Sequence, residues 1–152
     1  MKTLTSLTLL LAASAIYAQA PAEDRQLYLH AFRSPSIGLE YRVREVGIHA
    51  GLYTTILESG AKSTEFFKLG GTLYYGANGP SRGREFFLSA AYMRGQNRDY
   101  RRKDAGFIES GVRFDLKGGF EFRVGTGFLF ARDRRLKVNP TIGISYRVPL
   151  NR

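Results

Sequence analysis

The fold class is decided by one stretch of the sequence, Ile37-Gly38-Leu39-Glu40-Tyr41-Arg42-Val43-Arg44-Glu45-Val46-Gly47-Ile48-His49-Ala50-Gly51-Leu52-Tyr53. Apolar residues occupy every second position on both sides of Arg44-Glu45, and the positions between them are mostly charged residues or glycines. A period of two is typical of a β-strand with two unlike faces, whereas an amphipathic helix repeats every 3.6 residues. The stretch therefore predicts two strands, 37–43 and 46–53, joined by a tight turn.

The same alternation recurs along the chain, and no stretch sustains a helical period. Six further strands are predicted at 26–33, 65–75, 84–94, 105–116, 119–130 and 140–150, with turn signals such as Ser34-Pro35-Ser36 and Lys117-Gly118-Gly119 between them. An open sheet of eight antiparallel strands would expose two edges, and closure removes them. We therefore predict an all-β fold, an eight-stranded antiparallel up-and-down barrel.

The distribution of glycine indicates which face of the strands points inward. Eight glycines share the polar parity: Gly38, Gly47, Gly51, Gly70, Gly111, Gly125, Gly127 and Gly143. The apolar parity holds far fewer glycines, such as Gly71. Small residues beside large ones are needed where side chains must fit into the narrow lumen of an eight-stranded barrel. The polar face is therefore predicted to line the lumen, which leaves the apolar face outside.

Charged residues on the polar parity are close to balance. We predict a lumen charge network of nine residues: Glu40, Arg42, Lys68, Glu109, Arg113, Asp115, Glu121, Arg123 and Arg147. Mutual pairing would offset the cost of taking these charges out of water. The alternative is a soluble barrel on which the same charges are ordinary solvated side chains.

The apolar parity has the length and composition of a membrane-facing wall. Each predicted strand spans about 8 to 12 residues, which is what a tilted strand needs to cross a bilayer. Aromatic residues fall toward segment ends, as interfacial girdles would place them; they include Tyr41, Tyr75, Tyr92, Phe114, Phe120, Phe130 and Tyr146. The doublets Phe66-Phe67, Tyr74-Tyr75 and Phe86-Phe87 leave the parity of two strands open.

The N-terminus predicts export. Lys2 precedes an apolar stretch that is too short for a membrane-spanning helix, and Ala18-Gln19-Ala20 has the Ala-x-Ala form of a cleavage site. Residues 1–20 are therefore predicted to be a signal peptide, and 21–152 the barrel domain. No cysteine follows the site, which excludes a lipoprotein anchor.

Composition excludes several classes of site. The 152 residues contain no cysteine, which rules out a disulfide framework, a thiolate metal site and a cysteine nucleophile. We also find no Walker loop, dinucleotide fingerprint or calcium loop, so we predict neither a cofactor nor a metal. The net charge of +10 could suggest nucleic-acid binding, but removal of residues 1–20 leaves +9 on an exported chain that meets no genomic DNA.

Together, the signal peptide, eight alternating strands, charged lumen and aromatic outer face resemble the small Gram-negative outer-membrane barrels of the OmpA transmembrane-domain and OmpX type. The resemblance covers the whole predicted mature chain and concerns architecture, not a diagnostic motif. It implies an outer-membrane location, a plugged lumen, insertion by the barrel-assembly machinery and a monomeric state. The chain departs from the family in ending on Asn151-Arg152, where members commonly finish on an aromatic residue.

Basic residues concentrate in two predicted loops. Segments 94–104 and 131–138 each carry a net charge of +3, and the resemblance places both on the extracellular side. Arginine pairs well with phosphate. We hypothesise that seven residues contact lipopolysaccharide or another anionic partner: Arg98, Arg101, Arg102, Lys103, Arg132, Arg134 and Arg135. The alternative is that these loops are charged only for solubility.

Two other functions remain open at this stage. A soluble periplasmic barrel similar to a lipocalin would bind an apolar ligand in its lumen. A lipid A-modifying enzyme would need a serine nucleophile or a histidine base, and the chain offers only His30 and His49, in no recognisable catalytic motif. The function we expect is a structural, adhesive or lipopolysaccharide-interacting outer-membrane barrel without catalytic residues.

Overall fold

The protein forms a single closed barrel in the computed structural model, which describes residues 25–31, 36–56, 62–76, 83–97, 100–131 and 136–149. The predicted signal peptide lies outside these residues. The eight strands are β1 (Arg25–Ala31), β2 (Ile37–Val43), β3 (Val46–Thr55), β4 (Thr64–Tyr75), β5 (Arg84–Gly95), β6 (Asp104–Asp115), β7 (Phe120–Ala131) and β8 (Lys137–Val148). A 3-10 turn, η3 (Lys117–Gly119), separates β6 from β7. No helix in the described part of the chain is long and apolar enough to cross a membrane.

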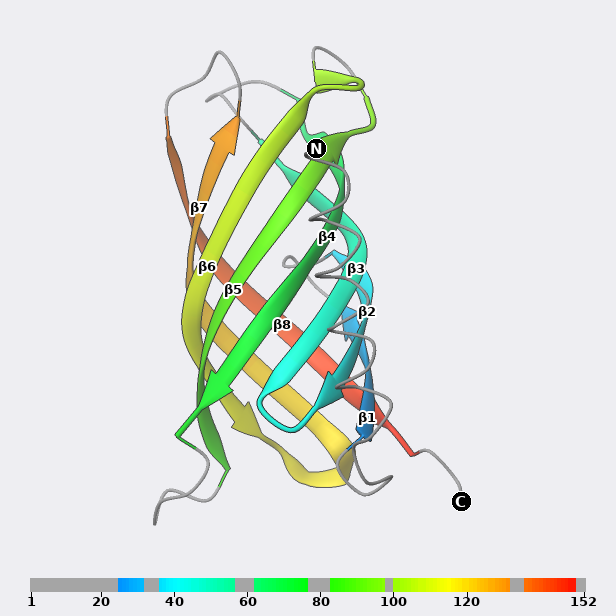
Figure 1. The fold of residues 1–152 in the computed structure, drawn as a ribbon, viewed down its shortest axis with the longest axis vertical. Coiled ribbons are helices and arrows are strands. Elements are labelled where there is room, and N and C mark those ends of the chain that lie inside the picture. Colours follow the sequence, from blue (N-terminus) through cyan, green and yellow to red (C-terminus); the bar gives the residue numbers. More distant parts are fainter. Residues whose placement is uncertain are drawn as a thin grey trace, which may run out of the picture.

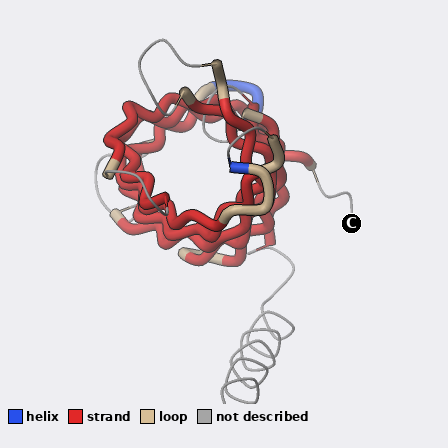
Figure 2. The backbone as a smooth tube through the Cα atoms, turned by 90° about the horizontal axis from the view of Figure 1, so that it is seen from above, coloured by secondary structure: helices blue, strands red, loops and turns tan. Residues whose placement is uncertain are grey.

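Each strand pairs antiparallel with its neighbours in the sequence, and β8 pairs with β1 to close the ring (Figures 1 and 2). The predicted up-and-down eight-stranded fold is confirmed. The strand boundaries agree within two residues at most ends, but β8 begins at Lys137, three residues before the predicted start. Pro140 therefore lies inside β8, opposite Thr126 of β7. Proline is compatible with this position because β1 pairs with β8 only from Ile144 onward.

The two ends of the barrel differ in their connections. We call the lower end the one that carries the Arg44–Glu45 turn and η3, and the upper end the one where β5 leads into β6 (Figure 1). Arg44 adopts a positive φ of 52°, as a two-residue hairpin turn demands. The carbonyl of Glu45 accepts a hydrogen bond of 2.8 Å from the backbone N–H of Tyr74, which ties this turn to β4.

The wall is lower along β1 and β2 than elsewhere. Ala31 pairs with Ile37, which pairs in turn with Leu52, so β3 continues for three more residues beyond its last partner in β2. Across this step, the Asn139 side chain of β8 donates hydrogen bonds to the Tyr53 hydroxyl (3.0 Å) and the Thr55 hydroxyl (3.3 Å) of β3. Side chains thus connect β8 and β3 above the short hairpin.

The register also shows which residue of each aromatic doublet points inward, a question that the alternation left open. Phe66, Tyr74 and Phe87 point into the barrel and are buried, whereas Phe67, Tyr75 and Phe86 point outward and are about half exposed. The outward side of the strands is apolar over most of its height, with exposed side chains that include Leu39, Ile48, Leu69, Leu73, Leu88, Ile108, Val124 and Ile144. The lumen holds the buried polar and charged residues.

Candidate functional site

The candidate functional site is the lumen, which two kinds of side chain fill at different heights. Charged residues occupy its lower and middle parts, and apolar residues close its upper part. Except for Tyr100, which lies between β5 and β6, both groups come from alternate positions of the strands, because successive side chains of a strand point to opposite faces.

The lower part contains an ionic cluster of four buried residues, Arg42, Glu85, Arg113 and Glu121. Arg42 donates two parallel hydrogen bonds to Glu85, of 2.8 and 2.9 Å. Arg113 pairs with the same carboxylate and also with Glu121, the latter at 2.8 Å. Glu85 therefore links two guanidinium groups from β2 and β6. The fork of Arg42 on Glu85 has the bidentate geometry that gives strong, well-oriented pairs.

Aromatic rings fill the space between these charges. The guanidinium of Arg42 lies 4.0 Å and that of Arg113 lies 4.9 Å from the centre of the Tyr74 ring. Arg113 also lies 5.5 Å from the ring centre of Tyr28. Each ring face attracts a cation electrostatically, which stabilises the clustered arginines.

A second contact chain lies above this cluster and involves Glu40. One carboxylate oxygen of Glu40 accepts a 2.7 Å hydrogen bond from the Tyr74 hydroxyl, and the other lies 2.9 Å from Nε2 of His30. All three side chains are buried. A Cβ added to Gly47 would lie 2.1 Å from the Glu40 carboxylate, so this glycine leaves the space that the carboxylate occupies.

The middle of the lumen holds Lys68, Glu109 and Arg123. Lys68 Nζ lies 3.2 Å from one oxygen of Glu109, and Arg123 lies 3.7 Å from the other. Lys68 also lies 4.5 Å from the centre of the Phe107 ring, and Arg123 lies 4.2 Å from that of Phe87. One carboxylate is thus the ionic partner of two buried cations, and an aromatic ring lies close to each cation.

The buried charges balance in number among the described residues. Four cations face four carboxylates: Arg42, Lys68, Arg113, Arg123, Glu40, Glu85, Glu109 and Glu121. Burial of unpaired charges would destabilise the fold strongly, whereas matched pairs with additional hydrogen bonds offset much of that penalty.

Above Lys68 the lumen is closed by an apolar cap. We define this cap as the cluster Tyr53, Phe66, Met93, Tyr100, Ala105, Phe107, Leu129 and Ala131. Tyr53 and Phe107 have ring centres 5.0 Å apart, and those of Phe66 and Tyr100 are 5.8 Å apart. A Cβ on Gly127 would lie 2.3 Å from the Phe107 ring, so the ring packs directly against the backbone of β7. The cap leaves little room at this level of the lumen.

Seven of the nine residues predicted for the lumen network lie inside the barrel, namely Glu40, Arg42, Lys68, Glu109, Arg113, Glu121 and Arg123. The other two, Asp115 and Arg147, are exposed at the lower end because their strands finish there. Asp115 still lies 3.8 Å from Arg113. Glu85 was missed, since it stands at the start of β5 beside the ambiguous Phe86-Phe87 doublet. Tyr100 was missed as well, because loop residues carry no alternation signal.

The predicted contact residues for anionic lipid fall into two groups. Arg101, Arg102 and Lys103 are exposed in the connection between β5 and β6. Arg98, Arg132, Arg134 and Arg135 lie outside the described residues.

The second histidine lies apart from the ionic cluster of the lower lumen. His49 Nδ1 lies 3.2 Å from the Thr72 hydroxyl, and both side chains are buried. Within the described ranges, no group of three or more His, Asp and Glu side chains is placed to hold a metal ion.

Comparisons with known proteins do not identify a family. No model of a known protein family matches the chain, and no curated protein matches its sequence significantly. The inference of function therefore depends on the geometry of the barrel itself.

Proposed function

We propose that this protein is an integral outer-membrane β-barrel whose lumen is closed by its own side chains, and that its role is structural, adhesive or lipid-interacting. The observation that carries the proposal is the inside-out distribution of polarity, with an apolar outer wall around a charged interior. A barrel that carries an apolar ligand in water would need the reverse arrangement.

The height of the outer wall supports this proposal. Along β5 the outward residues are Arg84, Phe86, Leu88, Ala90, Tyr92 and Arg94, so charge is confined to the two ends. For strands that rise about 3.3 Å per residue and tilt by about 40°, the two arginines are about 25 Å apart along the barrel axis. Outer-membrane barrels have an apolar band of about 25 Å.

Aromatic residues at the rim of the wall provide further support. At the lower end, Tyr75 stacks on Phe86 with ring centres 5.6 Å apart, and Phe120 lies 5.0 Å from Tyr146. At the upper end, Tyr92 is half exposed and donates a 2.6 Å hydrogen bond to Asp104. Rings at both interfaces are typical of membrane barrels.

The lumen supports a role without transport or catalysis. Gly47 and Gly127 are sites where side chains from other strands reach the backbone, which leaves little space for a solute. The His30–Glu40 pair is buried among other lumen residues, and this favours a structural role over that of a general base. The predicted signal peptide at 1–20 favours the outer membrane, because exported β-barrels insert there.

Cell fractionation and gel mobility test the proposal. We expect the full chain to sediment with outer membranes, to require detergent for extraction, and to change its mobility on a gel when boiled. Solubility without detergent, combined with a mobility that boiling does not alter, would contradict the proposal and favour a soluble barrel.

A further inference from the structure

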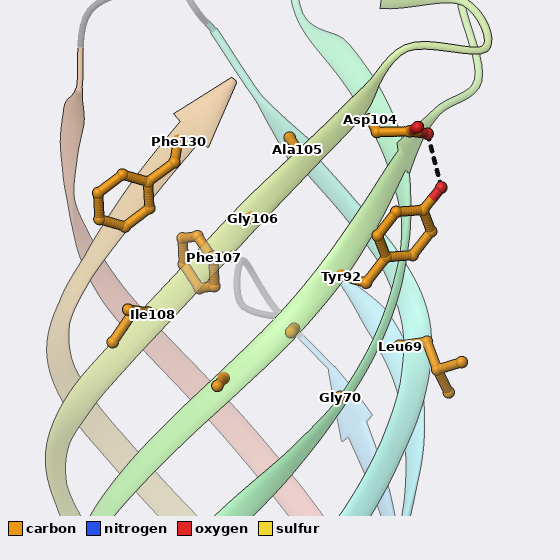
Figure 3. A pocket seen from close by; sticks show the side chains of 11 residues that line it. Leu69, Gly70, Tyr92, Asp104, Ala105, Gly106, Phe107, Ile108 and Phe130 are labelled. Carbon is orange, nitrogen blue, oxygen red and sulfur yellow. Dashed lines mark hydrogen bonds between the residues drawn. The ribbon is translucent and has the colours of Figure 1, made fainter. Parts of the chain in front are cut away.

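The outer wall carries a groove near its upper end. The groove has a volume of about 730 Å³, and its outward-facing lining comes from Leu69 of β4, Ala90 and Tyr92 of β5, Gly106 and Ile108 of β6, and Phe130 of β7. Figure 3 shows Tyr92 and Leu69 on one side of it, Ile108 and Phe130 on the other, Gly106 between them, and Asp104 above. Large apolar side chains thus border a depression with a low floor, where the residues are small.

Gly106 contributes to this low floor, and neither its backbone conformation nor a close contact requires a glycine there. Gly106 has no positive φ, and the nearest atom to an added Cβ would be a side-chain carbon of Phe130 at 4.0 Å. Lumen glycines differ, since a Cβ on Gly111 would lie 2.2 Å from the Val124 carbonyl. Glycine inside a strand weakens it, and it often marks a site where a ligand approaches the backbone.

Three basic residues lie directly beyond the groove. Arg101, Arg102 and Lys103 are exposed and precede Asp104, which borders the groove at the first position of β6. The connection that carries them is fixed in place. Its backbone is bonded to Gly95 in both directions, by the N–H of Arg102 and the carbonyl of Lys103, each at 2.9 Å.

Tyr100 anchors the same connection from inside the barrel. Its ring is 3% exposed and packs in the apolar cap against Phe66. Its backbone passes so close to Gly95 that a Cβ there would overlap the Tyr100 carbonyl. The three cations are therefore carried by a braced turn that leads directly into Asp104 at the groove, and the ammonium of Lys103 lies 5.5 Å from the centre of the Tyr100 ring. At the rim, Asp104 is occupied by Arg94 and by the Tyr92 hydroxyl, which reduces its repulsion of an anion.

We propose that the groove and this basic turn form a binding site for one anionic membrane lipid that carries a phosphomonoester head group. An acyl chain lies over Gly106 between Tyr92 and Ile108, while Arg101, Arg102 and Lys103 bind the phosphate. The proposal rests on the proposed function, because the groove meets acyl chains only if the wall faces lipid. A glycolipid of the lipid A type has both features.

Charge complementarity favours a phosphomonoester over a phosphodiester. The basic turn contributes three positive charges, and a monoester carries about −1.5 to −2 near pH 7 with three acceptor oxygens. A diester carries a single negative charge and fewer acceptors. Arginine also binds phosphate with two parallel hydrogen bonds, which adds geometric selectivity.

Native mass spectrometry of the folded full-length protein in detergent micelles tests the site. The probe is bis-phosphorylated lipid A, compared with phosphatidylglycerol as the diester and with lipid A lacking phosphate. We expect one lipid A per barrel, bound at least about tenfold more tightly than either comparison lipid. Equal binding of all three lipids would overturn the proposal.

Two sets of variants separate the head-group contacts from the groove. Arg101→Gln/Arg102→Gln/Lys103→Gln should weaken lipid A binding at least about tenfold, whereas Arg25→Gln/Arg84→Gln/Lys117→Gln at the opposite end should leave it within about twofold. Gly106→Leu should fill the groove and weaken binding comparably, whereas Ala50→Leu, elsewhere on the wall, should not. Gly106→Ala provides a milder substitution if the leucine variant fails to fold. An unchanged affinity in folded groove and head-group variants, or an equal loss in the controls, would overturn the site.

The experiments distinguish a failure of the proposed membrane function from a failure of the proposed lipid site. A wild-type barrel that needs detergent and shifts its mobility on boiling, yet binds lipid A no better than phosphatidylglycerol, retains the membrane function and lacks the site. A chain that is soluble without detergent contradicts both.

Discussion

The two faces of β5 carry opposite arrangements of charged and apolar side chains. Inward, the strand presents Glu85, Phe87, Ser89, Ala91 and Met93, which are buried or partly buried and run from charge at the lower end to the apolar cap. Outward, charge occurs only at the two ends, and the middle is apolar and exposed. The charges that a soluble protein would place outside lie inside here, and each has a partner. In the lumen, a charged side chain is compatible with burial because it has an ionic partner. On the outer wall, the medium around the barrel determines which side chains are compatible.

Removal of one lumen carboxylate should have the largest effect. Glu109→Ala leaves Lys68 and Arg123 buried without their shared partner, and we expect a loss of about 3–5 kcal/mol in the free energy of unfolding. Denaturant titration in detergent micelles measures it. Glu65→Ala, which removes an exposed carboxylate at the rim, should stay within about 0.5 kcal/mol.

A double variant checks that pairing causes this loss. Lys68→Met added to Glu109→Ala removes one orphaned cation and should recover part of the stability. If Glu109→Ala costs no more than Glu65→Ala, the lumen charges are not coupled as described.

Introduction of a charge on the wall should have the next largest effect. Leu88→Arg places a cation at mid-height on the outward face of β5, and we expect destabilisation of about 2–4 kcal/mol in lipid vesicles. Glu65→Arg places the same side chain at the rim, where about 0–1 kcal/mol is expected. An equal effect of both substitutions would mean that the middle of the wall is not in hydrocarbon.

The apolar cap should be more sensitive to a polar side chain than to a change of apolar shape. Phe66 is fully buried and packs on Tyr100, so Phe66→Leu should cost about 1–2 kcal/mol through imperfect packing. Phe66→Gln should cost more, because an amide must lose its hydration to enter this mostly apolar cluster. If glutamine is tolerated as well as leucine in denaturant titrations, the cap is wet and the lumen is more open than its packing indicates.

The smallest effects come from one conservative substitution made on both faces. Thr126→Val on the wall removes a hydroxyl from an exposed outward position and should stabilise the barrel in lipid by about 0.5 kcal/mol. Thr72→Val in the lumen removes the hydroxyl next to His49 and should destabilise it by about 1 kcal/mol. The same sign for both, measured in the same vesicles, would break the comparison between wall and lumen.

The alternation of apolar and polar residues predicts the strands correctly wherever one face of a strand carries apolar residues only. Residues 37–43 contain no ambiguity, and β2 has those bounds. The period fails at the doublets, since two adjacent rings of similar size fit either frame, and only the cross-strand register places Phe66 inside.

The apolar cap could not be predicted from the same pattern. It puts Phe66, Met93, Phe107 and Leu129 on the face that elsewhere carries charge, so these residues dilute the alternation instead of reinforcing it. The sequence also does not predict which charged residues pair with one another in the lumen. Glu85 meets Arg42 from a strand three positions away around the ring, a contact that depends on the strand tilt and the closed barrel. Neighbouring positions along one strand give no sign of it.

The most direct test of the proposal that the wall faces lipid is a cysteine scan of the outward side of β5. The sequence has no cysteine, so single substitutions at Arg84, Phe86, Leu88, Ala90, Tyr92 and Arg94 each provide one site for a spin label. With the protein in vesicles, we predict that accessibility to dissolved oxygen peaks at Leu88 and Ala90. Accessibility to a water-soluble nickel complex should instead be highest at Arg84 and Arg94. High nickel accessibility at Leu88, or a flat profile along the strand, would contradict an apolar wall in lipid.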